Sequence, residues 1–506
     1  MRKLIAIITI VIWFAISLFL AACGDYPYAG AGESYDVLET DTARAVENTY
    51  GEQVLQASQV YVGRHFNFRP VGDVTWRVEP SSGLDFGDIR GFSDGLAVFT
   101  DHDNNRGAID RDGNIVIPPM FRHIDDFIND VAVAYNQDNL AGIIDREGNI
   151  VVPFEYSFLA SVTYGSRFIG TRMVGDANRY GVIGRNGDIL IPFEFDWIQY
   201  ASYGMFGIVR EDKFGFAMQI SEDQTVSLPY DIDTGFWQHG PPFAGFSEWL
   251  APVAIQDGDD WRDRRYGVIN TRGEVVVPFY FDWIGLFNDG LAPVRLNDLY
   301  GFIDSEGNII IEIIYSWVQP FSEGLAVVGL GDRSSGNMEF GYIDRNGDMI
   351  ILPRPLKFAG PFSEGLAAVV LPDGAGGFIN IFGEMVIPAK FGVVEHVYRV
   401  GDIFAKFDRG LAVVGTADPH DRLYGVIDRS GNIILPFEYT YVRDFSYGLA
   451  MVWTWDREDP DRPYRYGFIN HNGEFILSMD FENATSFSEG LAVVQQDGLW
   501  GIVEIG

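Results

Sequence analysis

A short motif recurs along most of this chain and constrains its fold more than any other feature. Its clearest copies read FSEGLA, and successive units lie about 40 residues apart. A repeat of that length is typical of an array of small supersecondary units that pack on their neighbours, and it argues against separate enzyme domains. The clear copies begin at Phe92, Phe127, Phe246, Phe287, Phe321, Phe362, Phe407, Phe445 and Phe487, and weaker ones at Phe168 and Ala201 make about eleven units.

A second motif lies between the copies of the first and predicts a β-hairpin in each unit. In YGVIDRSGNIILP, two β-branched runs flank Asp428-Arg429-Ser430-Gly431, whose first and fourth residues suit a type I turn. With the LAVV run after the S-E-G turn, each unit is predicted to hold about three antiparallel strands. The proline that usually follows the hairpin has no amide to donate, so it ends the second strand or marks a sheet edge; examples are Pro153, Pro192, Pro278, Pro388 and Pro436.

The combination of an aromatic-glycine pair, the hairpin and the FSEGLA motif resembles the WG-repeat family of bacterial proteins. The resemblance covers Gly91 to Gly506, although the Trp-Gly pair itself occurs only as Trp500-Gly501. It implies a β-repeat protein, commonly at the cell envelope, with no established catalytic residues. Tyrosine or phenylalanine takes the place of the tryptophan at Tyr180, Phe214, Tyr266, Tyr300, Phe340, Tyr424 and Tyr466.

The sequence constrains the way in which the units assemble less than it constrains the strands within each unit. We expect an all-β tandem array of about eleven three-stranded units in an open solenoid or superhelix. The alternative is one or two β-propellers, but propellers typically have about four to eight blades, so eleven units would divide between two rings. The last unit ends in LWGIVEIG, a strand without a partner hairpin, which either caps the array or pairs with the segment from Val54 to Arg90.

The N-terminus has the layout of a secretory signal. Arg2 and Lys3 precede an apolar run, and Leu20, Ala21, Ala22 and Cys23 resemble a bacterial lipobox, in which the cysteine is lipidated. An uncleaved anchor helix is the competing interpretation. We therefore expect a signal peptide at 1–22, a flexible tether at 23–50, a degenerate N-terminal unit at 51–90 and the repeat array at 91–506, with an irregular unit at about 201–245.

Composition excludes several classes of function. Lys+Arg 36 against Asp+Glu 71 gives a net charge of −35, which disfavours nucleic-acid binding. The seven histidines are scattered without ligand spacing, and Cys23 is the only cysteine. The stretch from Asp110 to Asn114 begins like a calcium loop, but other copies lack its middle acid and the hairpin explains them all. We expect no catalytic residues, no metal and no cofactor.

One set of aromatic residues is a candidate ligand platform. Trp197, Trp283, Trp317 and Tyr441 follow the hairpin at one register, and Trp237 lies in the irregular unit. Such rings could stack on sugars or peptides, but alternate residues of a strand share a face, so a core role is the competing interpretation.

Together these features predict a non-catalytic lipoprotein outside the cytoplasm, held to a bacterial membrane by its lipid. Its repeat surface would bind an extracellular protein or envelope glycan. The alternatives are an extracytoplasmic hydrolase that acts on an envelope polymer and a purely structural spacer.

Overall fold

The computed structural model describes residues 74–506, except 203, 212, 222–223, 228–231, 234–244, 257–263, 333–337, 393–405, 417–422, 444 and 456–463. Every described residue lies in one compact unit, His65–Gly506. This part of the chain is almost entirely β-structure, with one short 3₁₀ helix, η1 (Pro80–Ser82). The described residues contain no helix that is long and apolar enough to cross a membrane.

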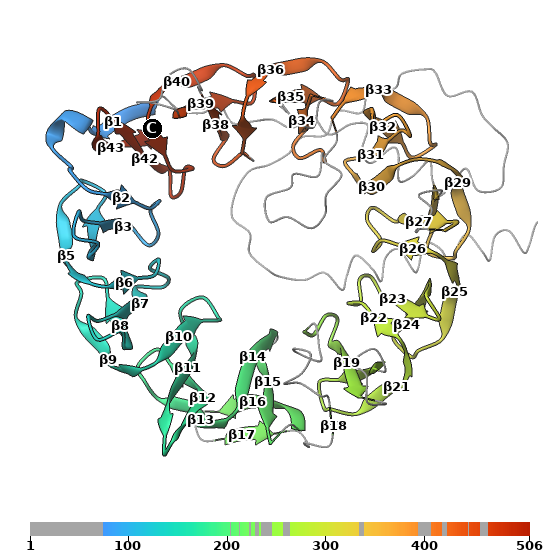
Figure 1. Cartoon of the computed structure of the whole chain (residues 1–506), viewed down its shortest axis with the longest axis horizontal. Helices are drawn as coiled ribbons and strands as arrows, with labels where there is room; N and C mark the ends of the chain where they lie inside the picture. The colour runs from blue at the N-terminus through green and yellow to red at the C-terminus, as the bar shows by residue number, and fades with distance from the viewer. Residues whose placement is uncertain are drawn as a thin grey trace, which may run out of the picture. The chain divides into compact units, whose positions relative to one another are not determined.

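The described strands form eleven antiparallel sheets, which follow one another in chain order (Figure 1). The first three are β2 (Asp88–Ile89), β3 (Leu96–Thr100), β4 (Arg106–Asp110) and β5 (Ile115–Phe121); β6 (His123–Ile124), β7 (Val131–Tyr135), β8 (Ala141–Asp145) and β9 (Ile150–Tyr156); and β10 (Phe158–Ser161), β11 (Arg167–Val174), β12 (Ala177–Gly184) and β13 (Ile189–Phe195). The next three are β14 (Trp197–Ser202), β15 (Met205–Arg210), β16 (Lys213–Ser221), β17 (Gln224–Ser227) and β18 (Ile232–Asp233); β19 (Leu250–Gln256), β20 (Arg264–Asn270) and β21 (Val275–Phe281); and β22 (Trp283–Ile284), β23 (Leu291–Leu296), β24 (Leu299–Asp304) and β25 (Ile309–Tyr315).

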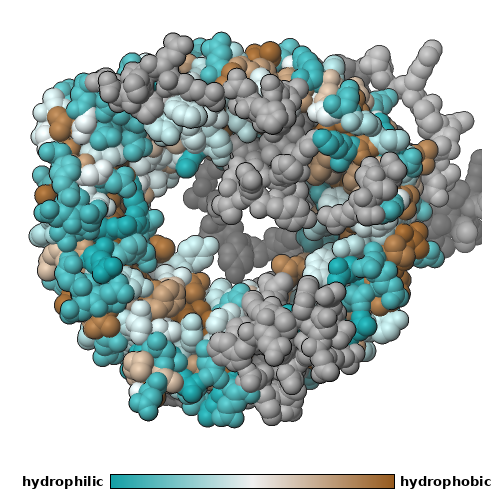
Figure 2. Space-filling view, in the orientation of Figure 1, coloured by the Kyte–Doolittle hydropathy of each residue, from teal (hydrophilic) through white to brown (hydrophobic). Residues whose placement is uncertain are grey.

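The remaining sheets continue the pattern. They are β26 (Trp317–Val318), β27 (Ala326–Leu330), β28 (Glu339–Ile343) and β29 (Met349–Pro355); β30 (Phe358–Ser363), β31 (Leu366–Val370), β32 (Gly376–Asn380) and β33 (Met385–Phe391); and β34 (Leu411–Gly415), β35 (Tyr424–Asp428) and β36 (Ile433–Tyr439). The last two are β37 (Tyr441–Val442), β38 (Leu449–Trp455), β39 (Tyr464–Asn470) and β40 (Phe475–Phe481); and β41 (Asn483–Ala484), β42 (Leu491–Gln496), β43 (Leu499–Ile505) and β1 (Val74–Val78). On the face drawn in Figure 2, the surface of the described residues is mainly hydrophilic.

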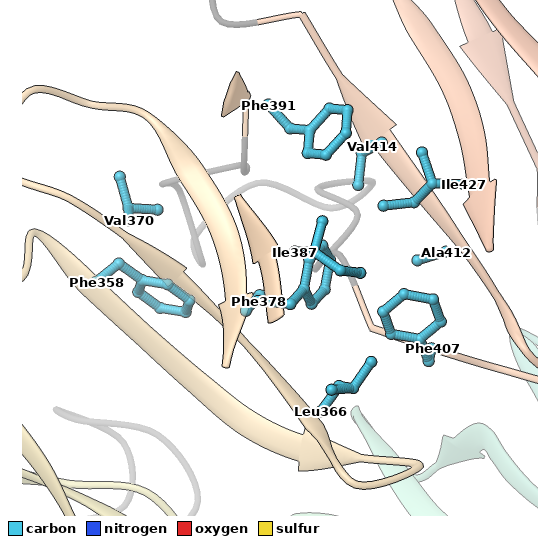
Figure 3. Close-up of a cluster of buried hydrophobic side chains, with 11 residues drawn as sticks. Phe358, Leu366, Val370, Phe378, Ile387, Phe391, Phe407, Ala412, Val414 and Ile427 are labelled. Carbon is cyan, nitrogen blue, oxygen red and sulfur yellow. The ribbon is translucent and has the colours of Figure 1, made fainter. Parts of the chain in front are cut away.

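The hydrophobic core consists of clusters that each join two consecutive sheets. In one of them, Phe378 and Ile387 of the sheet β30–β33 pack with Phe407 and Val414, which belong to the next sheet and its leading turn (Figure 3). Ten further clusters of the described residues follow the same rule, and one joins the last sheet to the first through Trp500 and Phe92. Because every sheet packs on the one before and the one after, the circuit closes on itself.

The first described strand completes the last sheet. β1 pairs antiparallel with β43, so that Val74 lies opposite Ile505 and Trp76 opposite Val503. The expectation that the final strand pairs with the segment from Val54 to Arg90 is therefore confirmed. Closed pairing of this kind is the arrangement of a β-propeller, here with eleven blades.

Two expectations about assembly were wrong. The array is not an open solenoid, and the propeller alternative holds as a single circuit of eleven blades. Most blades also have four strands, because two-residue strands such as β6 and β22 precede the S-E-G turn. Strands this short pair through two residues only and leave no alternating pattern in the sequence, so the sequence alone does not predict them. We number the strands of a four-stranded blade one to four in chain order, with β1 as the fourth strand of the last blade. The sheets β19–β21 and β34–β36 have no first strand among the described residues, so their strands are numbered two to four.

The glycine of the aromatic-glycine pair is required by a β-bulge between the third and fourth strands. Tyr300 pairs with Tyr315 and Phe302 with Ile311, so the register shifts across Gly301. A Cβ atom on Gly301 would lie 2.6 Å from the carbonyl oxygen of Ile311. Gly142 and Gly425 meet the facing carbonyl at the same 2.6 Å, so the crowding repeats from blade to blade.

The repeated proline marks the edge of the sheet. Pro153 is the fourth of the seven residues of β9 and Pro278 the fourth of β21, and the chain continues as a strand beyond each of them. Each strand lies at the end of its sheet, so the missing amide leaves the internal ladder intact. Of the two roles expected for this proline, edge marking is confirmed.

Candidate functional site

Four residues of the predicted aromatic platform occupy one position in their blades. Trp197, Trp283, Trp317 and Tyr441 are each the first residue of a first strand, β14, β22, β26 and β37. Each lies opposite a residue of the second strand, as Trp283 does opposite Arg295. All four side chains are half-buried. The fold therefore repeats these rings at one register, at the end of the first strand away from the S-E-G turn.

Three of these half-buried rings contact an aromatic ring of their own blade. Trp283 meets Tyr300 edge-on, with centroids 6.4 Å apart, and Trp317 meets Phe340 in the same way at 5.8 Å. Tyr441 stacks on Trp453 at 4.3 Å. These contacts fix the orientation of the rings and leave part of each accessible. Their role as a ligand platform stays a prediction.

The other predicted site residues lie outside the described residues. These are Trp237 in the irregular unit, and Leu20, Ala21, Ala22 and Cys23 of the lipobox. Nothing in the described part of the chain tests them.

The S-E-G turns join the first and second strands of the blades through two residues with positive φ. In the turn at Glu323 and Gly324, φ is +52° and +81°, and at Glu489 and Gly490 it is +54° and +78°. Two such residues in succession define a type I′ turn, which suits glycine at both positions. A glutamate in the first position costs about 1 kcal/mol of backbone strain. Because the glutamate recurs in several turns, we expect it to make a compensating contact.

The acidic side chain of one turn binds the backbone of the next. Glu323 accepts hydrogen bonds from the N–H groups of Glu364 and Gly365, at 2.7 and 2.8 Å, and Glu364 accepts one from Gly410 at 2.9 Å. The same contact runs from Gly290 to Glu248 at 2.8 Å. Each carboxylate thus satisfies amides in the neighbouring blade, which offsets the strain of its own backbone.

The serine before the acidic residue makes a second bond in the same direction. The hydroxyl of Ser322 donates to the carbonyl oxygen of Phe362 at 2.8 Å, and the phenylalanine side chain is buried between the blades. We call the serine–carbonyl and carboxylate–amide pair the blade latch. Serine donors also link Ser93 to Phe127, Ser247 to Phe287, Ser363 to Phe407, Ser446 to Phe487 and Ser488 to Phe92.

Arginines of the hairpin turns reinforce the latches. The guanidinium of Arg429 donates to the carbonyl oxygen of Glu364 at 2.8 Å, and that of Arg345 lies 3.1 Å from the carboxylate of Asp289. Arg111 pairs with Glu489 at 2.8 Å, across the junction of the first and last blades. In each case the arginine reaches back to the turn of the preceding blade.

A hollow of about 290 Å³ lies at this junction. It is lined by Asp94, Gly95, Arg111, Asp130, Arg146 and Glu489. Its carboxylates have partners, since Asp94 accepts from the N–H of Asp130 at 2.7 Å and Glu489 pairs with Arg111. The hollow is therefore a part of the latch system, and its groups hold blades together.

The hairpin turns contain a matched donor and acceptor. Asp304 accepts from the side-chain amide of Asn308 at 2.8 Å, whereas Asn270 donates its side-chain amide to Glu274 at 2.8 Å. The first residue also caps backbone N–H groups two and four positions on. Partial burial raises the pKa of Asp304, but the hydrogen bonds from Asn308, Glu306 and Gly307 together outweigh it and hold that pKa below its ordinary value.

The calcium-like loop is one of these turns. The carboxylate of Asp110 accepts hydrogen bonds from Asn114 and from the backbone of Asp112, and these bonds lower its pKa despite partial burial. Within the described residues, no group of three or more acidic, histidine or cysteine side chains could hold a metal ion.

The chain matches the family model described as WG containing repeat in nine segments. They are residues 107–139, 142–169, 180–214, 266–300, 300–333, 340–371, 377–399, 424–452 and 466–500, which together make up more than half of the chain. The chain belongs to the WG containing repeat family. In this WG-repeat protein each matched segment starts in the third strand of one blade or just before it, and most extend into the next blade, so the sequence unit is offset from the blade.

The single Trp-Gly pair of this WG-repeat protein lies where the circuit closes. Trp500 is buried, and its indole N–H donates to the carbonyl oxygen of Phe86 at 3.0 Å. Its backbone N–H also donates to Leu84 at 3.0 Å. The tryptophan therefore fastens the last blade to the segment that precedes the first.

Among solved structures, this WG-repeat protein is similar to three proteins at low identity. They are a eukaryotic initiation factor (10% identity, 76% of this chain and 95% of that one, TM-score 0.37), BamB from Moraxella catarrhalis (11%, 61% and 96%, 0.29) and PorZ from Porphyromonas gingivalis (10%, 85% and 72%, 0.20). These likenesses are too distant to bear on function. No curated protein matches the chain.

Proposed function

We propose that this WG-repeat protein is a non-catalytic scaffold of the bacterial cell envelope, lipid-anchored through Cys23, that binds an extracellular protein or an envelope glycan. The lipobox Leu20-Ala21-Ala22-Cys23 motivates the anchor. The half-buried rings at Trp197, Trp283, Trp317 and Tyr441 motivate the binding surface.

One observation carries the non-catalytic part of the proposal. The polar residues that the chain repeats are engaged in holding the fold: the serine and acid of the S-E-G turn bind the next blade, as at Ser322 and Glu323. The first and fifth residues of the hairpin turn bind each other, as at Asp304 and Asn308. Because these side chains are already hydrogen-bonded within the fold, the repeated unit provides a rigid surface. It does not provide a repeated reactive group.

The anchor is tested by metabolic labelling of bacterial cells that express the full chain. Wild-type protein is expected to incorporate an alkyne-tagged fatty acid and to stay with the membrane fraction, whereas Cys23→Ala loses the label and the membrane attachment. Label incorporation that survives Cys23→Ala would contradict lipidation at this residue.

The binding surface is tested by capture from solubilised envelope on the full chain in detergent. The double variant Trp283→Ala/Trp317→Ala is expected to lose captured protein or glycan. The matched control is Trp249→Gly, which removes an exposed tryptophan at the other end of the sheets and restores the glycine usual in that turn. Equal capture by all three proteins would argue for a different surface, and no saturable capture would argue for a spacer.

A further inference from the structure

The fourth strand β25 is an open, apolar sheet edge. Its sequence, IIIEIIY, has isoleucine at five of seven positions. Three of these side chains are exposed: Ile309 by 54%, Ile310 by 42% and Ile314 by 51%. Among the described strands, β25 pairs only with β24. Figure 2 shows hydrophobic surface at the right-hand edge, where Figure 1 draws β25 and β29.

Other fourth strands of the chain are protected in ways that β25 is not. β9, β13, β21, β33 and β36 carry proline at the fourth position, where β25 has Glu312. β40 also lacks proline, but its exposed fourth and sixth residues are Ser478 and Asp480, which hydrogen-bond to each other. Proline and charge are the usual means of blocking an edge, so β25 is better suited to accept another strand than these other fourth strands.

The missing proline is a local change on an unchanged backbone. β21 has Pro278, yet its register against β20 matches that of β25 against β24: Val277 lies opposite Val268 as Ile311 lies opposite Phe302. The position of Glu312 therefore tolerates proline in this fold. β25 therefore differs from β21 in its exposed isoleucine side chains and not in how the strand is paired.

The charge of the edge indicates what can occupy it. Two copies of the chain would pair their β25 strands antiparallel about a two-fold axis, which places Glu312, the central residue, beside Glu312. Like charges opposite each other are destabilising, and each chain carries a net charge of −35. The favourable occupant is a segment of another protein with apolar residues for the isoleucines and a lysine or arginine facing Glu312.

We propose that β25 binds an extended, basic–apolar segment of a partner protein by β-strand addition. Main-chain hydrogen bonds to the open edge supply affinity, and the isoleucines with Glu312 supply selectivity. The inference rests on the proposed function as a binding scaffold and deepens it, because it names the strand and the chemistry of one partner.

The test is a fluorescence-anisotropy titration of the full chain in detergent. The probe is a fluorescein-labelled synthetic nine-residue peptide of alternating isoleucine and threonine with a central lysine. Wild-type protein is expected to bind it saturably, and Glu312→Pro to bind it at least about tenfold more weakly, because proline removes a donor and the carboxylate. The matched control Ser478→Pro puts the same residue at the same position of β40, another fourth strand without proline, and is expected to bind as wild-type.

A charge reversal separates recognition from folding. Glu312→Lys is expected to prefer the peptide with a central glutamate over the one with a central lysine, a reversal that a folding defect does not produce. The proposal is overturned by absence of saturable binding to wild-type, by equal binding to Glu312→Pro, or by equal losses in both proline variants. The titration needs neither lipidation nor a native partner, so its failure is distinct from failure of the envelope capture.

Discussion

The carboxylate of Glu489 accepts a hydrogen bond of 2.9 Å from the backbone N–H of Gly95, a residue 394 positions earlier in the chain. The adjacent Ser488 binds the carbonyl oxygen of Phe92 at 2.7 Å. The two contacts repeat, between the chain's last and first blades, the latch that joins neighbours elsewhere. The closed circuit is therefore held by the same side chains as the rest of the fold.

Loss of the closing latch should lower stability. Glu489→Ala leaves the amide of Gly95 and the guanidinium of Arg111 without this partner, and we expect the free energy of unfolding to fall by about 1–3 kcal/mol. The measurement is the midpoint of urea unfolding, with Glu147→Ala, an exposed glutamate in a hairpin turn, as the control. A midpoint unchanged in Glu489→Ala would show that the Glu489 carboxylate adds nothing to closure.

Two glycines should respond differently to substitution. Gly301→Ala places a Cβ 2.6 Å from a backbone oxygen, and we expect a cost of about 1–3 kcal/mol from the forced backbone shift. Gly290 has φ of +81° with open space around it, so Gly290→Asn should cost only about a few tenths of a kcal/mol, because asparagine tolerates this conformation. Thermal unfolding of both variants checks the contrast. Equal losses would contradict the bulge as the reason for Gly301.

The hairpin pairs should behave as coupled units. Asn270→Asp sets a carboxylate against Glu274 and should destabilise, while the double variant Asn270→Asp/Glu274→Asn recreates the pair found at Asp304 and Asn308 and should recover most of the loss. A double-mutant cycle on unfolding free energies gives the coupling, which we expect at about 0.5–2 kcal/mol. Strict additivity would mean that the two positions act independently.

Acid should weaken the turns. The folded-state pKa values of Asp110 and Asp304 lie below the ordinary value, so their stabilisation is complete above the unfolded-state pKa of about 4 and is lost as the pH falls through the folded-state pKa. The melting temperature should therefore decline as the pH drops below about 4. Asp304→Asn, the residue found at the equivalent Asn270, removes one titrating group and should make that decline shallower; a steeper one would reverse the assigned sign.

The sequence predicted the local structure because local structure depends on nearby residues. The turn at Asp428 and the edge proline Pro153 follow from which backbone conformations and donors those residues allow, and both predictions were confirmed. The pairing of β43 with the segment before Arg90 could also be predicted from the sequence, because a final strand without a partner hairpin requires another strand to pair with.

Closure could not be predicted in the same way. The angle between successive blades depends on how side chains such as Phe378 and Phe407 fill the space between them, and no local motif records it. The blade latch did leave a signal: an acid such as Glu323 repeats at a turn position where glycine is the better residue. A residue that is repeated despite its backbone cost indicates a contact beyond its own turn. The ligand platform at Trp283 and its equivalents stays a prediction.

The offset between sequence unit and blade bears on how such a chain can change its length. A matched segment such as 466–500 carries the second half of one blade and the first half of the next, with the surfaces that meet between them. Duplicating or deleting one segment would therefore add or remove the equivalent of one blade, together with the surfaces through which it packs on its neighbours. Members with other numbers of copies can arise in single recombination steps, and only the meeting of the two chain ends has to be readjusted.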